Sequence, residues 1–388
     1  MFSIRMSKVI VAITLILMLA PLAVFAGGEK EEPAVSAPGT EQEATVTTEA
    51  AEPETITITD GFGREVTIKK PVKKVAIGHF VVSEMIKLLG AEDRIVAVDL
   101  RTTTDTLLYP EISQLPVIQT ADMHYEGINY EKIFELRPDI FVTAAFAGQG
   151  FEDITARLEP EIPVLALGVN DMKSILDSVK LLAVILGEEE KAGEYLAFCD
   201  ASMGTIANKV AEVPEKDKPR VYFEFIPYMT FNDDCPVFAD LIAQAGGINI
   251  AADMSQQWGM VDPEWVMMRD PDIIVSEAQP YPMMGTPGVA CGYDVDDPAG
   301  MEAHRNASMA RSELAELKAV KTGKVYGFFY GLAVGGKLLV GTAYLAKWFH
   351  PNLFADLDPQ AIHQEYLTKF MRIDYDLSQH GVFVYPEP

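Results

Sequence analysis

The chain has 388 residues, enough for two domains with separate hydrophobic cores, and its formal net charge is −26. The first 26 residues contribute +2 and the next 28 contribute −7, which leaves −21 for residues 55–388. An acidic balance of this size excludes nucleic acid as the expected partner, because binding to phosphates requires a basic surface.

The first 26 residues have the pattern of a secretory signal peptide. Arg5 and Lys8 precede an apolar run, which ends in Val24-Phe25-Ala26 with small residues at the positions that signal peptidase reads. We therefore expect residues 1–26 to be cleaved and the protein to be exported to the periplasm. The alternative is an uncleaved membrane tether, which the short run and Pro21 disfavour. No Cys lies near the cleavage position, which argues against a lipid anchor.

Residues 27–54 differ sharply in composition from the rest of the chain. This segment contains eight Glu and one Lys, together with many Ala, Thr, Pro and Gly residues. Such a segment cannot bury a core, so we expect a disordered acidic linker.

The folded part begins with a predicted hairpin, in which Ile56–Thr59 and Glu65–Ile68 alternate around the turn Asp60–Gly63. Strands are then expected at 75–78, 95–98, 140–142 and 164–167, and helices at 82–89 and 151–158. Alternation of strands and helices at this rhythm indicates an α/β fold with mainly parallel pairing.

One segment occurs twice, 133 positions apart. Asn129-Tyr130-Glu131 leads to Pro138-Asp139 and an apolar strand, and Asp262-Pro263-Glu264 leads to Pro271-Asp272 and another strand at the same spacing. A capping residue, a short amphipathic helix, a Pro stop and a buried strand make one αβ unit. Two copies predict two similar lobes with a cleft between them.

Between the two copies, the alternation of predicted strands and helices gives way to predicted helix alone. Residues 171–213 are almost entirely helix-like, with an interruption at Gly187, and a continuous helix over 188–213 would span roughly 35–40 Å. We expect a first lobe at 55–187, a connecting helix at 188–213 and a second lobe at 214–388. Two Rossmann-like lobes joined by one long helix permit only modest opening.

Several short sequence segments, taken in their order along the chain, resemble the substrate-binding proteins of ABC importers for iron-siderophore complexes, haem or cobalamin. The resemblance covers about residues 55–375. The matching segments are Thr57–Thr67, Pro71–Val75, Leu89–Val98, Leu317–Tyr326 and Tyr344–Pro351. The resemblance implies the helix-linked periplasmic-binding fold with a ligand cleft between its lobes. It also implies delivery to a dimeric ABC permease by a protein that is monomeric when free.

In that family one surface Glu on each lobe docks into a basic pocket of the permease. The motif places these residues at Glu131 and Glu264. The alternative is a structural role alone, because a Glu in the first turn of a helix is favourable against the helix dipole.

The ligand is expected where the carboxyl ends of both sheets meet, since ligands of open α/β sheets bind there. The loops at these ends contain many aromatic and Met residues, which suit a large, partly apolar ligand. The predicted ligand-binding residues are His79, Phe80, Arg101, Thr102, Met123, His124, Tyr125, Phe146, Tyr228, Phe231, Gln257, Trp258, Tyr281, Met283 and Tyr330.

Three ligand chemistries remain open at these loops. Arg101 suits an anionic ferric chelate through charge-assisted hydrogen bonds, or forms a surface salt bridge. His79 and His124, with a carboxylate such as Glu277, suit a bare metal ion or an incompletely wrapped chelate. A Tyr such as Tyr125 or Tyr281 can ligate haem iron.

The expected function is capture of an iron(III)-siderophore-type chelate, with a corrinoid or haem as the alternative ligand. Direct binding of a metal ion ranks lower, and an enzyme lowest, because nucleophile-elbow, phosphate-loop and dinucleotide motifs are absent. Gly335-Gly336-Lys337 lacks the remaining residues of a phosphate loop. We expect no cofactor. Cys235 and Cys291 can form a disulfide after export, and the sequence leaves this open.

Overall fold

The computed structural model describes residues 54–120, 127–145 and 150–388. All of these residues belong to one compact unit that spans 52–388. The expected signal peptide and nearly all of the acidic linker lie outside the described residues, as do the predicted ligand residues Met123, His124, Tyr125 and Phe146. No helix in the described part of the chain is long and apolar enough to cross a bilayer.

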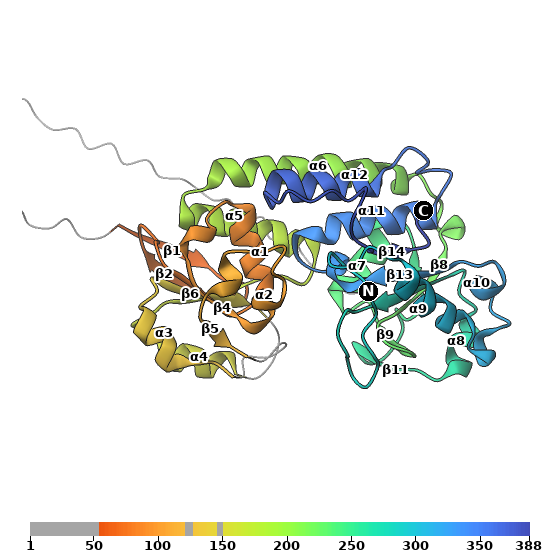
Figure 1. Cartoon of the computed structure of the whole chain (residues 1–388), viewed down its shortest axis with the longest axis horizontal. Coiled ribbons are helices and arrows are strands. Elements are labelled where there is room, and N and C mark those ends of the chain that lie inside the picture. Colours follow the sequence, from red (N-terminus) through yellow and green to blue (C-terminus); the bar gives the residue numbers. More distant parts are fainter. Residues whose placement is uncertain (1–53, 121–126, 146–149) are drawn as a thin grey trace, which may run out of the picture. The chain divides into compact units, whose positions relative to one another are not determined.

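The first lobe contains a five-stranded parallel sheet with the order β5-β4-β3-β6-β7 (Figure 1). Alternate residues of its strands belong to two different core clusters, with Val75 and Ile77 on one face and Ala76 on the other. Helices therefore cover both faces, which explains why the strands are apolar throughout. The strands are β3 (Val75–Ile77), β4 (Ile95–Asp99), β5 (Val117–Gln119), β6 (Ile140–Ala144) and β7 (Val164–Leu167). The helices are α1 (Phe80–Leu88), α2 (Leu100–Thr104), α3 (Tyr130–Leu136), α4 (Phe151–Leu158) and α5 (Met172–Leu186).

The predicted hairpin is present as β1 (Thr55–Thr59) and β2 (Glu65–Lys69), which pair antiparallel. Asp60 shapes its turn, because its Oδ1 accepts hydrogen bonds from the backbone N–H groups of Phe62 and Arg64. The Gly61 N–H donates to the Ala166 carbonyl at 2.7 Å. The Arg64 guanidinium donates to the Val164 carbonyl at 2.7 Å, so the hairpin is attached to β7.

The second lobe repeats the architecture with the sheet order β10-β8-β12-β13-β14. Three of its pairings are parallel, and the last strand, β14, pairs antiparallel with β13. The strands are β8 (Arg220–Glu224), β10 (Ile248–Asn249), β12 (Ile273–Ala278), β13 (Val325–Phe329) and β14 (Val384–Tyr385), with a separate ribbon of β9 (Met229–Phe231) and β11 (Trp258–Met260). The helices are α7 (Pro236–Gln244), α8 (Pro263–Arg269), α9 (Ala299–Met309), α10 (Lys318–Lys321), α11 (Leu338–Phe349) and α12 (Pro359–Glu365). The predicted α/β class with mainly parallel sheets is confirmed.

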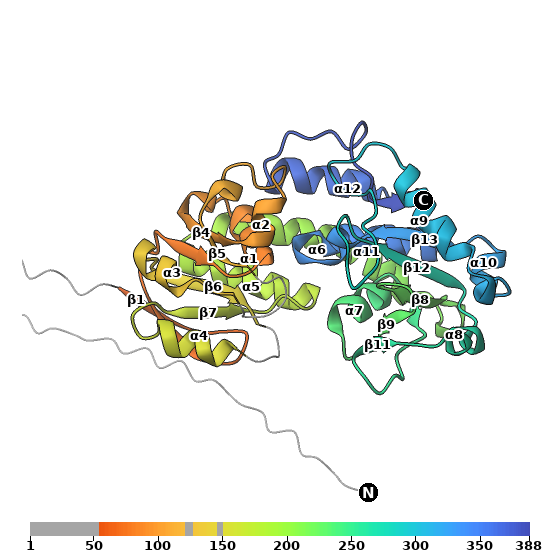
Figure 2. The same cartoon turned by 60° about the horizontal axis from the view of Figure 1, so that its bottom comes forward.

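One long helix, α6 (Glu189–Ala211), joins the lobes. It has 23 residues, which corresponds to about 35 Å at 1.5 Å per residue. Gly187 separates it from α5, because its φ of 71° lies in the left-handed region that ends a helix. The buried face of α6 packs against α5 of the first lobe and α11 of the second (Figures 1 and 2).

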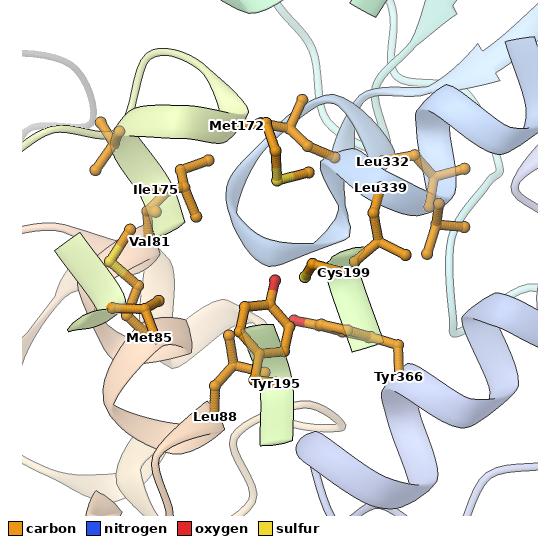
Figure 3. Packing of buried hydrophobic residues seen from close by; sticks show 14 of the residues in the cluster. Val81, Met85, Leu88, Met172, Ile175, Tyr195, Cys199, Leu332, Leu339 and Tyr366 are labelled. Carbon is orange, nitrogen blue, oxygen red and sulfur yellow. The ribbon is translucent and has the colours of Figure 1, made fainter. Parts of the chain in front are cut away.

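The largest hydrophobic core runs through both lobes without a break. Figure 3 shows Val81 and Met85 of α1 and Tyr195 of α6 in the same cluster as Leu339 of α11 and Tyr366 near the C-terminus. A wide separation of the lobes would expose this apolar surface to water at a cost of about 25 cal/mol per Å². The shared core, like the long helix, restricts the lobes to small movements.

The duplicated segment forms the same αβ unit in each lobe. Both helices end in a left-handed residue, Arg137 (φ 50°) after α3 and Asp270 (φ 39°) after α8. The Asp of each Pro-Asp stop then ties its strand to the start of a neighbouring strand in the sheet, β3 for Asp139 and β8 for Asp272. Asp139 Oδ2 accepts from the Lys74 N–H at 2.9 Å, and Asp272 Oδ2 accepts from the Arg220 N–H at 2.8 Å.

The two copies differ at the start of the helix. Asn129 caps α3, since its side chain accepts a hydrogen bond from the Lys132 N–H at 3.0 Å. Asp262 makes no such side-chain hydrogen bond to α8. Pro263 at the first helical position favours the start of α8 instead, because its fixed φ suits the helix and it has no N–H that needs a partner.

Candidate functional site

A cavity of about 270 Å³ lies at the expected place, where the carboxyl ends of strands from both lobes meet. Phe80 and Arg101 line it from the segments after β3 and β4. Tyr281 and Tyr330 line it from the segments after β12 and β13. Four predicted ligand residues are thus brought together from four separate parts of the chain.

Arg101 is the centre of this group. Its guanidinium carbon lies 4.2 Å from the ring centroid of Phe80, 4.9 Å from that of Tyr330 and 5.3 Å from that of Tyr281. Its Nη2 also donates a hydrogen bond to the Tyr281 hydroxyl. One cation of the first lobe therefore contacts two aromatic residues of the second, a geometry that favours attraction between the charge and the ring faces.

The start of α2 holds Arg101 in this position. Asp99 caps the helix, because its Oδ1 accepts from the backbone N–H groups of Arg101 and Thr102 at 2.9 and 3.1 Å. The Thr102 hydroxyl donates to Asp99 Oδ2 at 2.7 Å and contacts the Ser83 hydroxyl at 2.8 Å. Burial raises the pKa of Asp99, while these hydrogen bonds oppose the rise. Thr102 is buried and does not line the described part of the cavity.

The charges on the described part of the lining are mixed. Arg101 and Lys337 are basic, and Asp105 and Asp294 are acidic and come from opposite lobes. Burial is the main cause that raises the pKa of Asp105, and the nearby charges of Asp294 and Glu84 add to it. Lys337 is paired with buried Glu84 at 2.8 Å. The described lining therefore does not form a purely cationic site.

His79 is buried at the start of α1. Its Nδ1 accepts a hydrogen bond from the Val81 N–H at 3.3 Å, which leaves the ring proton of the neutral form on Nε2. Burial, with the Arg101 charge as a smaller cause, lowers the pKa of His79 to about 3. Ligation of a metal ion by Nδ1 therefore requires that this backbone hydrogen bond break.

Glu277, the carboxylate considered for a metal site, is also buried. Its Oε1 accepts a hydrogen bond from the Gln279 amide at 2.8 Å, and burial raises its pKa well above the usual range. Within residues 54–120, 127–145 and 150–388, no group of three or more His, Cys, Asp or Glu side chains is placed to hold a metal ion. His124 and Tyr125 lie outside these residues.

The other predicted ligand residues that the structure describes do not line the cavity. Phe231 stacks on Phe238 of α7 with ring centroids 4.3 Å apart. Tyr228 has a φ of 64° and its N–H donates to Glu224 at 2.8 Å, which turns its hydroxyl toward Glu313. Gln257, Trp258 and Met283 lie in surface segments of the second lobe, and Trp258 is 53% exposed.

The structure also places residues in the cavity wall that the sequence did not indicate. Asp105 and Tyr109 follow Arg101 by four and eight positions, beyond the end of α2 at Thr104. Lys337 follows two glycines in a turn before α11 and had no sequence signal for this role. Tyr293 and Asp294 lie in a long segment without regular structure between β12 and α9. Cys291 also lines the cavity, and the structure has Cys199, Cys235 and Cys291 as free thiols.

Glu131 and Glu264 occupy the same place in the two copies of the αβ unit. Each lies in the first turn of its helix and is exposed. Among the described residues, neither carboxylate takes part in an ion pair. The structure thus presents a solvent-facing carboxylate at the equivalent position of each lobe.

Comparison with known protein families decides the identity of the fold. Residues 75–328 match the profile of the family described as periplasmic binding protein. The chain belongs to this family. It is a substrate-binding protein of the ABC transporter type, so the resemblance seen in the sequence is confirmed.

Individual relatives of this periplasmic binding protein carry different names. An uncharacterized ABC transporter substrate-binding lipoprotein, YvrC of Bacillus subtilis (strain 168), is 26% identical over 78% of this chain and 87% of its own length. The molybdate-binding protein MolA of Haemophilus influenzae is 22% identical over 82% of this chain and 91% of its own. The crystal structure of a TroA-like periplasmic binding protein, FepB of Veillonella parvula, has a TM-score of 0.69 at 24% identity and covers 85% of this chain and 99% of its own.

Proposed function

We propose that this periplasmic binding protein captures an iron(III)-siderophore-type chelate and delivers it to a dimeric ABC permease. The supporting observation is the cavity between the lobes, in which Arg101 contacts Phe80, Tyr281 and Tyr330. A chelate presents carbonyl or carboxylate oxygens that accept hydrogen bonds from a guanidinium. Its organic part packs on the aromatic rings.

The mixed charge of the lining favours a chelate of low net charge. Asp105 and Asp294 repel a ligand with several negative charges, and they attract N–H groups and ammonium groups. A ferric hydroxamate fits this balance better than a ferric tris-catecholate, because the hydroxamate complex is close to neutral. The same two carboxylates disfavour a free oxyanion such as the molybdate named for MolA.

A corrinoid or haem is the alternative ligand. Six aromatic side chains line the described wall, among them Tyr109 and Tyr293, and they suit a flat macrocycle. Tyr281 already bonds Arg101, so ligation of haem iron by its hydroxyl requires that this contact break. A bare metal ion ranks lower, because His79 uses Nδ1 as an acceptor and Glu277 is deeply buried.

Delivery depends on Glu131 and Glu264 in our proposal. Each carboxylate docks into a basic pocket of one permease subunit, which the pair of equivalent helices supports. Charge reversal of both residues is expected to abolish transport and leave ligand affinity intact. Transport that survives the double reversal contradicts the docking role.

We further propose lobes at 55–187 and 214–388 around a connecting helix at 188–213, in a protein exported by cleavage after Ala26. Intact-mass analysis of the protein from its native host tests the cleavage. A mature chain that begins at Gly27 supports it, and a mass that includes residues 1–26 shows an uncleaved tether.

The decisive experiment on the ligand uses the mature protein purified from the native host. Its absorption spectrum and metal content are measured together, because ferric hydroxamate, ferric catecholate, haem and corrinoid absorb differently. Iron with a hydroxamate band supports the proposal. Cobalt or a Soret band supports the alternative ligand, and molybdenum without an organic chromophore contradicts both.

A further inference from the structure

The second-lobe helix α8 exposes apolar side chains beside Glu264. Met267 and Met268 follow this Glu by three and four positions, so all three residues share one face of the helix. Met267 is 43% exposed and Met268 is 78% exposed. Neighbouring exposed apolar side chains mark interaction sites, and flexible thioether side chains adapt well to a partner.

The equivalent face in the first lobe has a different character. The repeat aligns Met267 with Phe134 and Met268 with Glu135. Phe134 packs against the core cluster under α3 and is partly buried. Glu135 is exposed and forms an ion pair with Lys132 at 2.9 Å. The α3 face around Glu131 is therefore charged, whereas the α8 face around Glu264 is apolar.

Arg269, the basic residue at the end of α8, interacts with groups other than Glu264. The Arg269 guanidinium lies 3.7 Å from the ring centroid of Trp265. It also donates to the Ile250 carbonyl at 3.0 Å and to Asp253 at 2.8 Å. Arg269 therefore does not neutralise Glu264, and the α8 face keeps one negative charge beside its two Met side chains.

We propose that Glu264, Met267 and Met268 form a mixed acidic and apolar docking face for the permease, which we call the α8 face. This inference rests on the proposed delivery function and extends it. The α8 face binds a basic residue surrounded by apolar side chains, so its contact is partly insensitive to salt. The α3 face binds by charge, and its contact weakens as salt screens it.

The permease is the occupant that the chemistry favours. An anionic lipid surface requires Lys and Arg beside the apolar residues, and the α8 face has Glu264 instead. A second copy of this chain, related by a two-fold axis, would place Glu264 near its own equivalent. In Figure 1, α3 and α8 lie on the side of the molecule away from α6 and α12, as a partner that contacts both helices requires.

The test compares Met267→Gln/Met268→Gln with Met284→Gln, a matched control because Met284 is 61% exposed and lies outside α8. Affinity of the full-length mature protein is measured for its cognate permease in lipid nanodiscs, at about 0.1 M and about 0.5 M NaCl. We expect the double variant to bind about tenfold more weakly at both salt concentrations. We expect Glu131→Gln to weaken binding mainly at the lower salt concentration, and Met284→Gln to bind like the wild type.

Each other outcome overturns the inference. Wild-type affinity of the double variant, with an unchanged circular dichroism spectrum, shows that the apolar side chains do not contact the permease. If the wild type binds empty nanodiscs of the same lipids and the double variant does not, the α8 face contacts the membrane and not the permease. Normal transport by the double charge reversal at Glu131 and Glu264 refutes delivery through these helices, which is a separate result from the affinity of the Met variants.

Discussion

Glu84 and Lys337 form a buried ion pair that connects the two lobes at the wall of the cavity. They are 253 positions apart, and Nζ of Lys337 lies 2.8 Å from Oε1 of Glu84. The side chains are 1% and 6% exposed. The Tyr366 hydroxyl also donates to Glu84, so a carboxylate of α1 is held by two groups of the second lobe.

Removal of one partner from this pair is expected to destabilise the protein strongly. Glu84→Gln leaves the Lys337 charge buried without its counter-ion, and the expected loss is about 3–5 kcal/mol in the free energy of unfolding. Urea unfolding followed by tryptophan fluorescence measures it. The double variant Glu84→Gln/Lys337→Met is expected to recover part of the loss. Equal stability of Glu84→Gln and wild type contradicts the buried pair.

Arg101 is expected to govern ligand affinity with little effect on folding. Arg101→Lys keeps the charge and loses the planar group that contacts Phe80, Tyr281 and Tyr330, so we expect affinity for a ferric hydroxamate to fall about tenfold or more. Tyr281→Phe removes the hydrogen bond that Arg101 donates to the Tyr281 hydroxyl, and we expect it to cost roughly 1 kcal/mol of affinity. Quenching of intrinsic fluorescence measures both. An Arg101→Lys protein with wild-type affinity shows that the guanidinium does not contact the ligand.

Glu277 is expected to make stability depend on pH. Burial raises its pKa well above the usual range, so the folded state keeps a proton that the unfolded state releases above about pH 4.3. The stability that this group contributes is therefore fully present at low pH and is lost as pH rises toward the folded-state pKa, by up to about 1.4 kcal/mol per pH unit. Glu277→Gln lacks this dependence.

The measurement is urea unfolding of the wild type and Glu277→Gln between pH 4 and pH 8. The stability of the variant relative to the wild type should increase with pH. A constant difference across this range shows that the carboxyl titrates alike in the folded and unfolded states.

The three thiols are expected to be free and slow to react in the folded protein. Burial raises the pKa of Cys199 and Cys291 to about 12 and that of Cys235 to about 11, so few thiolates are present at neutral pH. Titration with a chromogenic disulfide should proceed slowly in buffer and give three equivalents after denaturation without reductant. One equivalent after denaturation shows a disulfide, as the sequence allowed for Cys235 and Cys291.

Much of the fold was predictable from local patterns. The Pro-Asp stop at Asp139 and Asp272 marks the same αβ unit twice, because each Asp bonds the backbone of the neighbouring strand. Gly187 predicted the break before the long helix, because a left-handed residue ends α5 there. These signals are local and depend on few distant contacts.

The cavity was predictable only in part. Arg101, Tyr281 and Tyr330 follow strands directly, so the rule that ligands bind at the carboxyl ends of parallel strands found them. Tyr228 also follows a strand, yet its backbone conformation and its bond to Glu224 direct it elsewhere. Lys337 reaches the wall from a turn before a helix, a position to which that rule does not apply.

The sequence by itself determined the strand and helix order, the duplicated unit and the length of the connecting helix, because hydrophobic period, capping residues and Pro or Gly stops act over a few residues. Only the tertiary structure decided which distant side chains share an environment. It paired Glu84 with Lys337, placed Asp294 opposite Asp105 and left Met267 and Met268 exposed. These outcomes depend on burial and charge across the two lobes, which no local pattern records.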